Sequence, residues 1–182
     1  MLRFLFLIPI CLVFSSISAQ KFMTREGVIA FRGETILETI DPVSNQAGSV
    51  IDFEGGSLVV QVLQKSFRFR KALMEEHYNE NYVHSDKYPR AVFKGNFSEK
   101  IDFRTPGTYA IKLSGTMEMH GVSRPISTLA EIIVQPDGKL SLESVFTISP
   151  EDYNIKIPGN VRDKIAEIFE VRMKAVYQPV QK

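Results

Sequence analysis

The chain contains one cysteine and no tryptophan among its 182 residues. Cys11 lies inside an apolar N-terminal run, and Ile10 stands where a lipid-anchored lipoprotein needs a small residue before its cysteine. We therefore interpret Cys11 as part of a removed leader, which leaves a mature chain without thiols. This excludes structural disulfides and cysteine-based zinc sites, so a hydrophobic core must stabilise the mature protein.

The chain also lacks an excess of charge of either sign. Its 22 Lys and Arg residues face 21 Asp and Glu residues, and loss of Arg3 with the leader makes the two counts equal. A net charge near zero provides no electrostatic basis for binding nucleic acid or an anionic membrane surface. We predict no nucleic-acid partner.

The first 19 residues have the order of features that is typical of a secretory signal peptide. Arg3 precedes an apolar run over residues 4–14, and small residues follow as far as Ala19. The run is shorter than the roughly 20 apolar residues of a membrane-spanning helix, which argues against a stable membrane anchor. We predict cleavage after Ala19, a periplasmic or secreted location, and a single domain over residues 20–182.

Strict alternation of apolar and polar residues marks long strands in the second half of the chain. Apolar or small residues occupy every second position of residues 109–119, 140–148 and 169–177. Side chains along a strand point to opposite faces in turn, so each segment has one buried and one exposed face. A hairpin turn is predicted at Pro136-Asp137-Gly138, where proline and glycine suit consecutive turn positions.

The remaining segments predict further strands and two short helices. The other predicted strands cover residues 28–33, 49–53, 58–69, 91–97 and 126–134. A shift of the apolar phase near Gln64-Lys65 indicates a bulge in the third of these. The helices are predicted over 70–82 and 160–168, the second beginning with an Asn160/Asp163 capping pair and burying Val161, Ile165 and Ile168.

About eight half-buried strands in one domain predict an all-β fold, an antiparallel β-barrel with two short helices. Closure removes the unpaired sheet edges and accommodates long tilted strands. Small residues share the inward positions with large ones, and they are Ala91, Gly95, Gly115, Ser144 and Ala175. They favour a lumen that holds a ligand. Alternatively, they only make room for bulky neighbours in a filled barrel.

Catalytic and metal-binding motifs have little support in the sequence. His77 and His84 are seven residues apart, with Glu76 and Asp86 nearby, but this spacing matches no compact metal motif. The chain contains no Gly-x-Ser-x-Gly turn, and residues 54–57 are better interpreted as a hairpin turn than as a phosphate loop. We predict a protein that is not an enzyme, with no cofactor and no metal.

Three segments, taken in order, resemble the YceI-like, polyisoprenoid-binding family. Tyr88-Pro89 followed by Phe93 resembles its Tyr-Pro-x-x-x-Phe segment. Residues 107–125, from Gly107-Thr108-Tyr109 to Arg124-Pro125, are similar to its central strand and turn. Phe146-Thr147-Ile148 with residues 152–158 is similar to its closing segment. The resemblance spans residues 27–178, and the order and spacing of the segments make it specific.

The resemblance implies a lipocalin-like barrel, exported to the periplasm, whose lumen holds a long isoprenoid-type lipid. The residues that we predict to line this lumen are Phe67, Phe69, Leu73, Met74, Phe93, Leu113, Gly115, Met117, Met119, Phe146, Ile148, Phe169 and Met173. The candidates for contacts with a lipid head group are His77, Tyr78, Asn81, Tyr82 and His84. The inward methionines suit a flexible lipid, although methionine is also a common core residue.

We therefore expect a carrier or scavenger of an isoprenoid, quinone or fatty-acid derivative. Each buried methylene contributes about 0.8 kcal/mol, so a few isoprene units offset an association cost of roughly 4–15 kcal/mol. One alternative is a structural or interaction module, including one that forms a homodimer. Its barrel would be plugged by Phe67, Phe69, Phe93, Phe97, Phe146 and Phe169. A metal enzyme that depends on His77 or His84 is the third hypothesis.

The exported protein is expected to begin at Gln20, because the signal peptidase recognises the small residues that end at Ala19. Intact-mass measurement of protein recovered from the cell envelope or the medium should show the loss of residues 1–19. A mass that still includes the apolar run would contradict this prediction.

Overall fold

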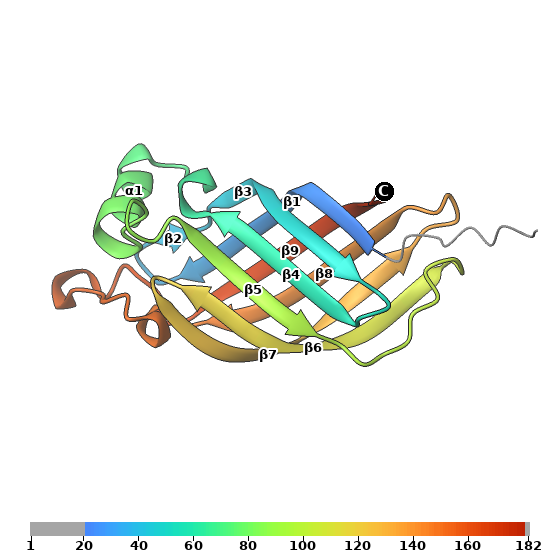
Figure 1. The fold of residues 1–182 in the computed structure, drawn as a ribbon. Coiled ribbons are helices and arrows are strands. Elements are labelled where there is room, and N and C mark those ends of the chain that lie inside the picture. The colour runs from blue at the N-terminus through green and yellow to red at the C-terminus, as the bar shows by residue number, and fades with distance from the viewer. Residues whose placement is uncertain (1–20, 181–182) are drawn as a thin grey trace, which may run out of the picture.

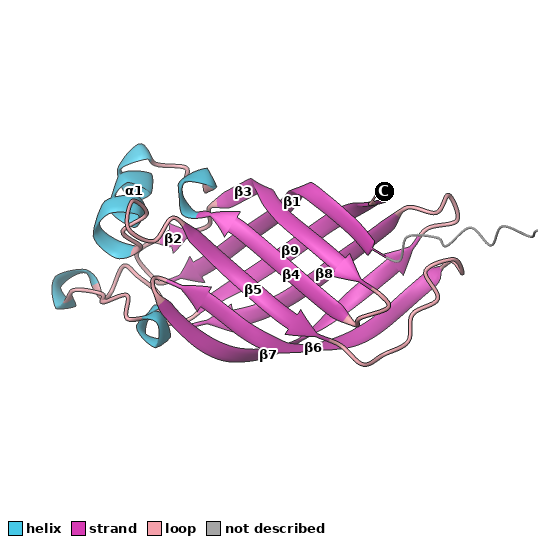
Figure 2. Cartoon of the chain, viewed as in Figure 1, coloured by secondary structure: helices cyan, strands magenta, loops and turns pink. Residues whose placement is uncertain are grey.

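Buried and exposed side chains alternate along much of the length of most long strands of the computed structural model, which describes residues 21–180. The strands pair antiparallel in the order β2-β1-β3-β4-β5-β6-β7-β8-β9, and β1 also pairs with β9. This last pairing closes eight strands into a barrel, with the two-residue β2 as an addition beside β1. The predicted all-β, lipocalin-like antiparallel barrel is therefore confirmed (Figures 1 and 2).

The strand bounds show long, nearly continuous pairing around the barrel. The strands are β1 (Lys21–Glu34), β2 (Thr39–Ile40), β3 (Val43–Asp52), β4 (Ser57–Leu63), β5 (Arg90–Asn96), β6 (Gly107–Met119), β7 (Val122–Val134), β8 (Leu140–Ile148) and β9 (Phe169–Pro179). The helical elements are η1 (Gln64–Ser66), α1 (Ala72–His77), η2 (Tyr78–Tyr82), η3 (Pro150–Tyr153) and η4 (Gly159–Val161). The helical elements gather at one end of the barrel (Figure 2).

The end of the barrel away from α1 is closed by four phenylalanine rings. Phe22 packs against Phe53 and Phe103 with ring centroids 5.6 and 5.3 Å apart, and Phe53 also contacts Phe97. Edge-to-face pairs of this kind stabilise beyond the area they bury. We call Phe22, Phe53, Phe97 and Phe103 the phenylalanine plug. Buried aliphatic residues next to it, such as Ile132, complete a close-packed core.

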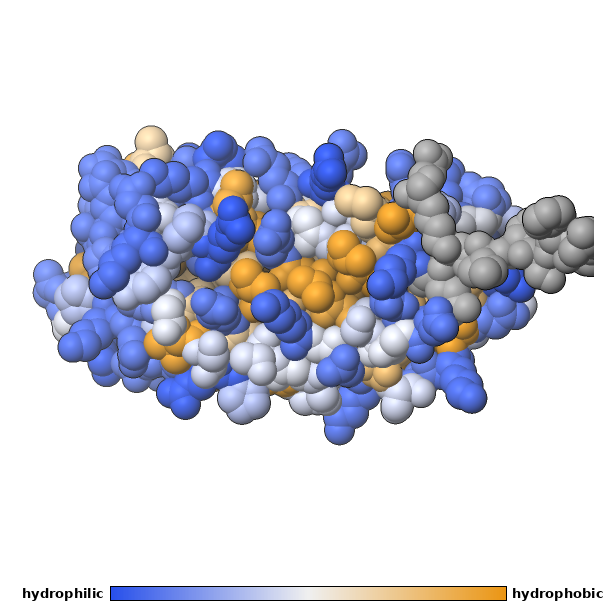
Figure 3. All heavy atoms as spheres, in the orientation of Figure 1, coloured by the Kyte–Doolittle hydropathy of each residue, from blue (hydrophilic) through white to orange (hydrophobic). Residues whose placement is uncertain are grey.

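The outer surface of the barrel is mainly polar. Figure 3 shows hydrophilic residues over most of the face in view, with an apolar strip across its middle. Val50 and Val59 are paired neighbours on β3 and β4, and they expose 41% and 40% of their surface. Small groups of exposed apolar residues are usual on protein surfaces.

The link between β6 and β7 is shorter than the sequence pattern indicated. The predicted strands 109–119 and 126–134 leave residues 120–125 between them, but only His120 and Gly121 turn, with φ of 52° and 74°, and Met119 pairs with Val122. Positive φ at both central positions is typical of a two-residue hairpin whose twist matches the strands. Pro125 fits inside β7 because β8 pairs with β7 only from Ala130 onward.

Two further predictions need correction. The predicted strand 58–69 ends at Leu63, and the phase shift arises from the 3-10 turn of η1 instead of a bulge. The predicted helix 160–168 is only the 3-10 turn of η4, without a side-chain cap, and Ile168 is exposed. The backbone N–H groups of Val161 and Lys164 donate to the carbonyls of Pro158 and Val161, which is the 3-10 spacing, so this run forms separate tight turns instead of an α-helix. The first predicted helix is confirmed as α1 continuing into the π-helical turn η2.

Two of the small inward residues serve close strand packing. Gly115 on β6 faces Gly95 on β5, and a Cβ built on Gly115 would lie 2.1 Å from the Lys94 carbonyl oxygen. A Cβ on Gly95 would lie 2.3 Å from the Phe93 ring. These glycines therefore accommodate their neighbours, which is the alternative that the sequence left open. Gly115 does not leave space for a ligand.

Gly115→Ala should lower the free energy of unfolding by about 1–3 kcal/mol, because the added methyl overlaps the backbone of β5. Gly48→Ala is the matched control, since a Cβ there meets its nearest atom, Gln61 Cγ, at 3.6 Å. That control should be neutral or stabilising by up to about 1 kcal/mol. Denaturant unfolding of both variants would measure the difference, and equal midpoints would contradict the prediction.

Candidate ligand-binding site

An apolar cavity of about 520 Å³ extends into the barrel from the end covered by α1. Its walls come from barrel strands, from α1 and η2, and from residues 155–165. A cavity of this size lies within the range of small-molecule sites, about 300–1,000 Å³. The barrel interior is therefore divided into the phenylalanine plug at one end and a cavity at the other.

Twelve of the thirteen predicted lumen residues line this cavity. They are Phe67, Phe69, Leu73, Met74, Phe93, Leu113, Met117, Met119, Phe146, Ile148, Phe169 and Met173. Gly115 is the exception, because β5 lies directly against it. Among the small inward residues, Ala91 and Ser144 line the cavity, whereas Ala175 is buried in the packed part of the barrel. The sequence therefore placed these twelve residues correctly, as part of a larger lining set.

A cluster of aromatic rings forms the cavity wall nearest to α1. The Phe31 ring is 5.1 Å from Phe67 and 5.7 Å from Phe169, measured between centroids. Tyr78 lies 5.0 Å from Phe69 and 5.6 Å from Phe31. These rings come from β1, β9, η2 and the segment after η1. They bring chain-distant segments together around one apolar surface.

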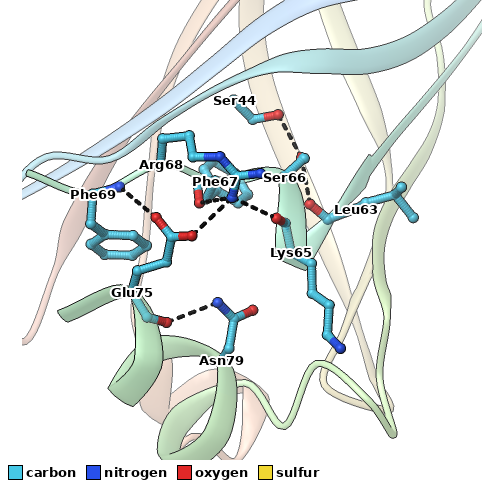
Figure 4. Close-up of polar contacts among 9 residues, drawn as sticks. All are labelled: Ser44, Leu63, Lys65, Ser66, Phe67, Arg68, Phe69, Glu75 and Asn79. Carbon is cyan, nitrogen blue, oxygen red and sulfur yellow. Dashed lines mark hydrogen bonds and ion pairs between the residues drawn. The ribbon is translucent and has the colours of Figure 1, made fainter. Parts of the chain in front are cut away.

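Polar contacts hold α1 and the segment before it at the barrel end (Figure 4). Glu75 accepts hydrogen bonds from the Arg68 guanidinium at 2.9 Å and from the Phe69 backbone N–H at 3.2 Å. Asn79 donates to the Glu75 carbonyl oxygen at 2.8 Å. All six residues of α1 are partly or fully exposed, so these contacts, and not a buried apolar face, set its position.

Gln64 and Tyr78 bring the main polar contact into the cavity wall. The Tyr78 hydroxyl donates to Gln64 Oε1 at 2.5 Å, and both residues line the cavity. Burial raises the pKa of Tyr78, so its hydroxyl stays protonated and remains a donor. Ser144, the other buried polar residue in the wall, donates to the Leu129 carbonyl oxygen at 2.8 Å.

The structure separates the five predicted head-group residues into two sets. His77, Tyr78 and Tyr82 line the cavity. Asn81 and His84 lie outside the lining set, and the exposed His84 ring stacks on His120 with centroids 5.4 Å apart. Within residues 21–180, no group of three or more His, Cys, Asp or Glu side chains is arranged to hold a metal ion.

The sequence reasoning missed several wall residues for which a signal existed. Phe31 shares its phase with the buried Ile29 on β1, and Gln64 continues the inward phase of Val60 and Val62. A polar residue at a position where the pattern expects an inward apolar one could have marked Gln64 as a wall residue. Ile165, predicted as a buried residue of a helix, lines the cavity from an irregular loop instead.

The entrance lies between α1 and the loop before β9. Leu73 and Lys71 line the cavity on one side, and Val161 and Lys164 on the other. Leu73 nevertheless exposes 60% of its surface, so the apolar wall reaches the outside of the molecule here. No helix in the described part of the chain is long and apolar enough to cross a bilayer.

Comparison with known proteins identifies relatives of the same architecture. The family model described as YceI-like domain matches residues 17–177. A polyisoprenoid binding domain from Saccharophagus degradans is similar with a TM-score of 0.75 and 12% identity, covering 89% of this chain and 99% of its own. Burkholderia cenocepacia BcnA is similar with a TM-score of 0.70 and 9% identity, covering 84% and 96%.

A third similar structure is a Campylobacter jejuni YceI protein, with a TM-score of 0.52 and 14% identity, covering 100% of this chain and 91% of its own. At these identities the structures show the fold alone. A search of curated protein sequences finds no significant match.

Tyr78→Phe should make the protein less sensitive to alkaline pH. The pKa of Tyr78 is raised in the folded protein, whereas the unfolded chain ionises this hydroxyl near pH 10, the ordinary value. Above about pH 10 the unfolded state therefore binds fewer protons, and the free energy of unfolding falls by about 1.4 kcal/mol per pH unit for this group. Denaturant unfolding at several alkaline pH values should show a shallower fall in the variant. An unchanged slope would contradict the assignment.

Proposed function

The chain belongs to the YceI-like family, and from this premise we propose that it is an exported carrier that holds an isoprenoid-type lipid in its barrel cavity. The lipid class comprises polyisoprenoids, prenyl quinones and long fatty-acid derivatives. The proposed location is the periplasm or the medium, after removal of residues 1–19. These residues lie outside the described part of the chain, so the sequence carries this part of the proposal.

The observation that carries the proposal is an apolar cavity inside an otherwise packed barrel. Protein interiors are close-packed, and an unfilled apolar space of this size forfeits dispersion contacts along its walls. A long hydrocarbon chain in the cavity restores those contacts, and its own apolar surface is removed from water at the same time. The similarity of the fold to a domain described as polyisoprenoid binding supports the same ligand class.

The distribution of phenylalanines argues against the filled-barrel alternative. Of the six residues proposed to plug the barrel, only Phe97 belongs to the phenylalanine plug. The other five line the cavity, and they are Phe67, Phe69, Phe93, Phe146 and Phe169. In the proposed complex these rings contact the lipid chain. His77, Tyr78 and Tyr82 lie near its polar end, since all three come from the segment at the entrance.

The proposed binding depends on the fit of the lipid chain to the cavity and on burial of its apolar surface, and it involves no chemical reaction. The twelve predicted residues that line the cavity supply apolar contact along the chain, as a carrier requires. The strands that bear most of them are paired on both sides, so the wall keeps its shape while the ligand enters and leaves.

Three alanine-to-phenylalanine variants test the proposal with the same chemical change in three environments. Ala91 lines the cavity, Ala175 is 1% exposed in the packed part, and Ala110 faces outward from β6. Ala91→Phe should fill part of the cavity, so the bound lipid per protein should fall several-fold with little change in thermal midpoint. Ala175→Phe should lower stability by about 1–3 kcal/mol through overpacking.

Ala110→Phe is the control, and it should retain both the lipid and the thermal midpoint of the parent. Lipid is measured by mass spectrometry of extracts from gently purified protein, and stability by thermal unfolding of the same preparations. A parent protein that yields no prenyl or acyl species from its native host would count against the carrier function. Equal lipid content in the parent and in Ala91→Phe would show that the lipid binds elsewhere.

A further inference from the structure

Gln64 places an unpaired hydrogen-bond donor at the wall of the apolar cavity. Its side chain follows the inward phase of Val60 and Val62, and the residue is 1% exposed. Its Nε2 has no hydrogen-bond partner within the described residues. Among the described residues, the other buried side-chain atoms without a hydrogen-bond partner are Asn79 Oδ1 and His120 Nε2. Neither of those residues lines the cavity.

One end of the Gln64 amide is engaged and the other is free. Tyr78 donates its hydroxyl proton to Oε1, so the oxygen has a partner inside the protein. The backbone of Gln64 is also paired, because its N–H donates to the Pro89 carbonyl oxygen and its own carbonyl accepts from Phe67. The amide nitrogen is thus the one polar group of this residue without a bond.

The surroundings of the amide offer little to satisfy that donor. The cavity wall nearby consists of aromatic rings, including Phe31, Phe67 and Phe69. A buried amide N–H without an acceptor is unfavourable, and natural proteins rarely leave one unpaired. A ligand that consists of hydrocarbon alone would leave this donor unpaired, whereas an oxygen on the ligand would pair with it.

We infer that Gln64 Nε2 donates a hydrogen bond to a carbonyl oxygen of the bound lipid, so that the cavity selects carbonyl-bearing chains over plain hydrocarbons. This inference rests on the proposed function and names the ligand class within it. The carbonyl belongs to a ketone, quinone, ester or amide at the α1 end of the chain. Nε2 has less than 1 Å² of exposed surface, so the amide turns about its terminal torsion to meet the ligand. That torsion has a broad energy profile, and the Tyr78 hydroxyl can reorient with it.

The π-helical turn η2 provides a second, independent indication of a binding role. It spans Tyr78–Tyr82 and presents both tyrosines to the cavity. Single π-helical turns are rare and are found frequently at functional sites. Here the turn sets Tyr78 over Gln64, and the two residues together form a polar point in an apolar wall.

The experiment compares two ligands that differ in one group. Geranylgeranylacetone carries a ketone on a prenyl chain, and its hydrocarbon counterpart has a methylene in place of the carbonyl. Both are titrated into delipidated mature protein by displacement of bound 1-anilinonaphthalene-8-sulfonate. The parent should bind the ketone about tenfold more tightly, as expected for one recovered hydrogen bond. In Gln64→Leu this ratio should fall to about one, with affinity for the hydrocarbon retained.

Gln61→Leu is the matched control, because Gln61 lies on β4 shortly before Gln64 and faces outward. It should keep the parental ratio. Infrared spectra of the bound ketone give a second readout that does not depend on affinity. Its carbonyl stretch should lie at lower frequency in the parent than in Gln64→Leu, because a hydrogen bond weakens the carbonyl bond. If Gln64→Leu does not fold, Gln64→Met takes its place, because it keeps an unbranched side chain of similar length and removes the amide donor.

The outcomes separate this inference from the proposed function. If the parent binds both ligands equally, with the carbonyl frequency of a hydrocarbon solvent, the carrier function stands and the role of Gln64 is overturned. If the parent binds neither ligand, the proposed function itself fails. A tenfold preference that persists in Gln64→Leu would assign the carbonyl contact to another residue and would also overturn the inference.

Discussion

Closure of β1 onto β9 is the constraint on which the rest of this structure depends. β1 pairs with β3 on one side and β9 on the other, and its register shifts between Thr24 and Ile29. These irregularities bend the strand so that it can pair with both β3 and β9. The same strand places Phe22 in the phenylalanine plug and Phe31 in the cavity wall. One closed ring thus provides a sealed end and an open end.

The residues that face inward decide how the closed space is divided. Where glycines face each other, as Gly95 and Gly115 do, β5 and β6 approach closely and the Phe93 ring packs across Gly95. Phe169 covers Gly33 in the same manner, since a Cβ there would lie 2.3 Å from its ring. Large rings lie over small residues along the wall, and the centre stays empty. Small inward residues are therefore compatible with a cavity without themselves being its space.

The sequence predicted those features that repeat along a strand, and it failed where local geometry decides. Alternation located β6, β8 and β9 almost to the residue. The first half of β3 was missed, because its inward residues Ser44 and Ala47 are small or polar and leave no apolar period. The fate of Gly115 could not be predicted, since alternation gives the direction of a side chain but not the distance to the neighbouring strand.

The barrel wall and the cover at its entrance are held by different forces. The wall strands are fixed to their neighbours by ladders of backbone hydrogen bonds, whereas α1 is attached through exposed ion pairs such as Arg68–Glu75 and Lys71–Glu38. Surface ion pairs of this kind contribute only about 0–1 kcal/mol each. Segments that are attached by weak contacts have the lowest free energy of local opening. A ligand that enters between α1 and the loop before β9 therefore breaks no strand pairing, and a shift of α1 would disturb only these surface contacts and not the barrel wall.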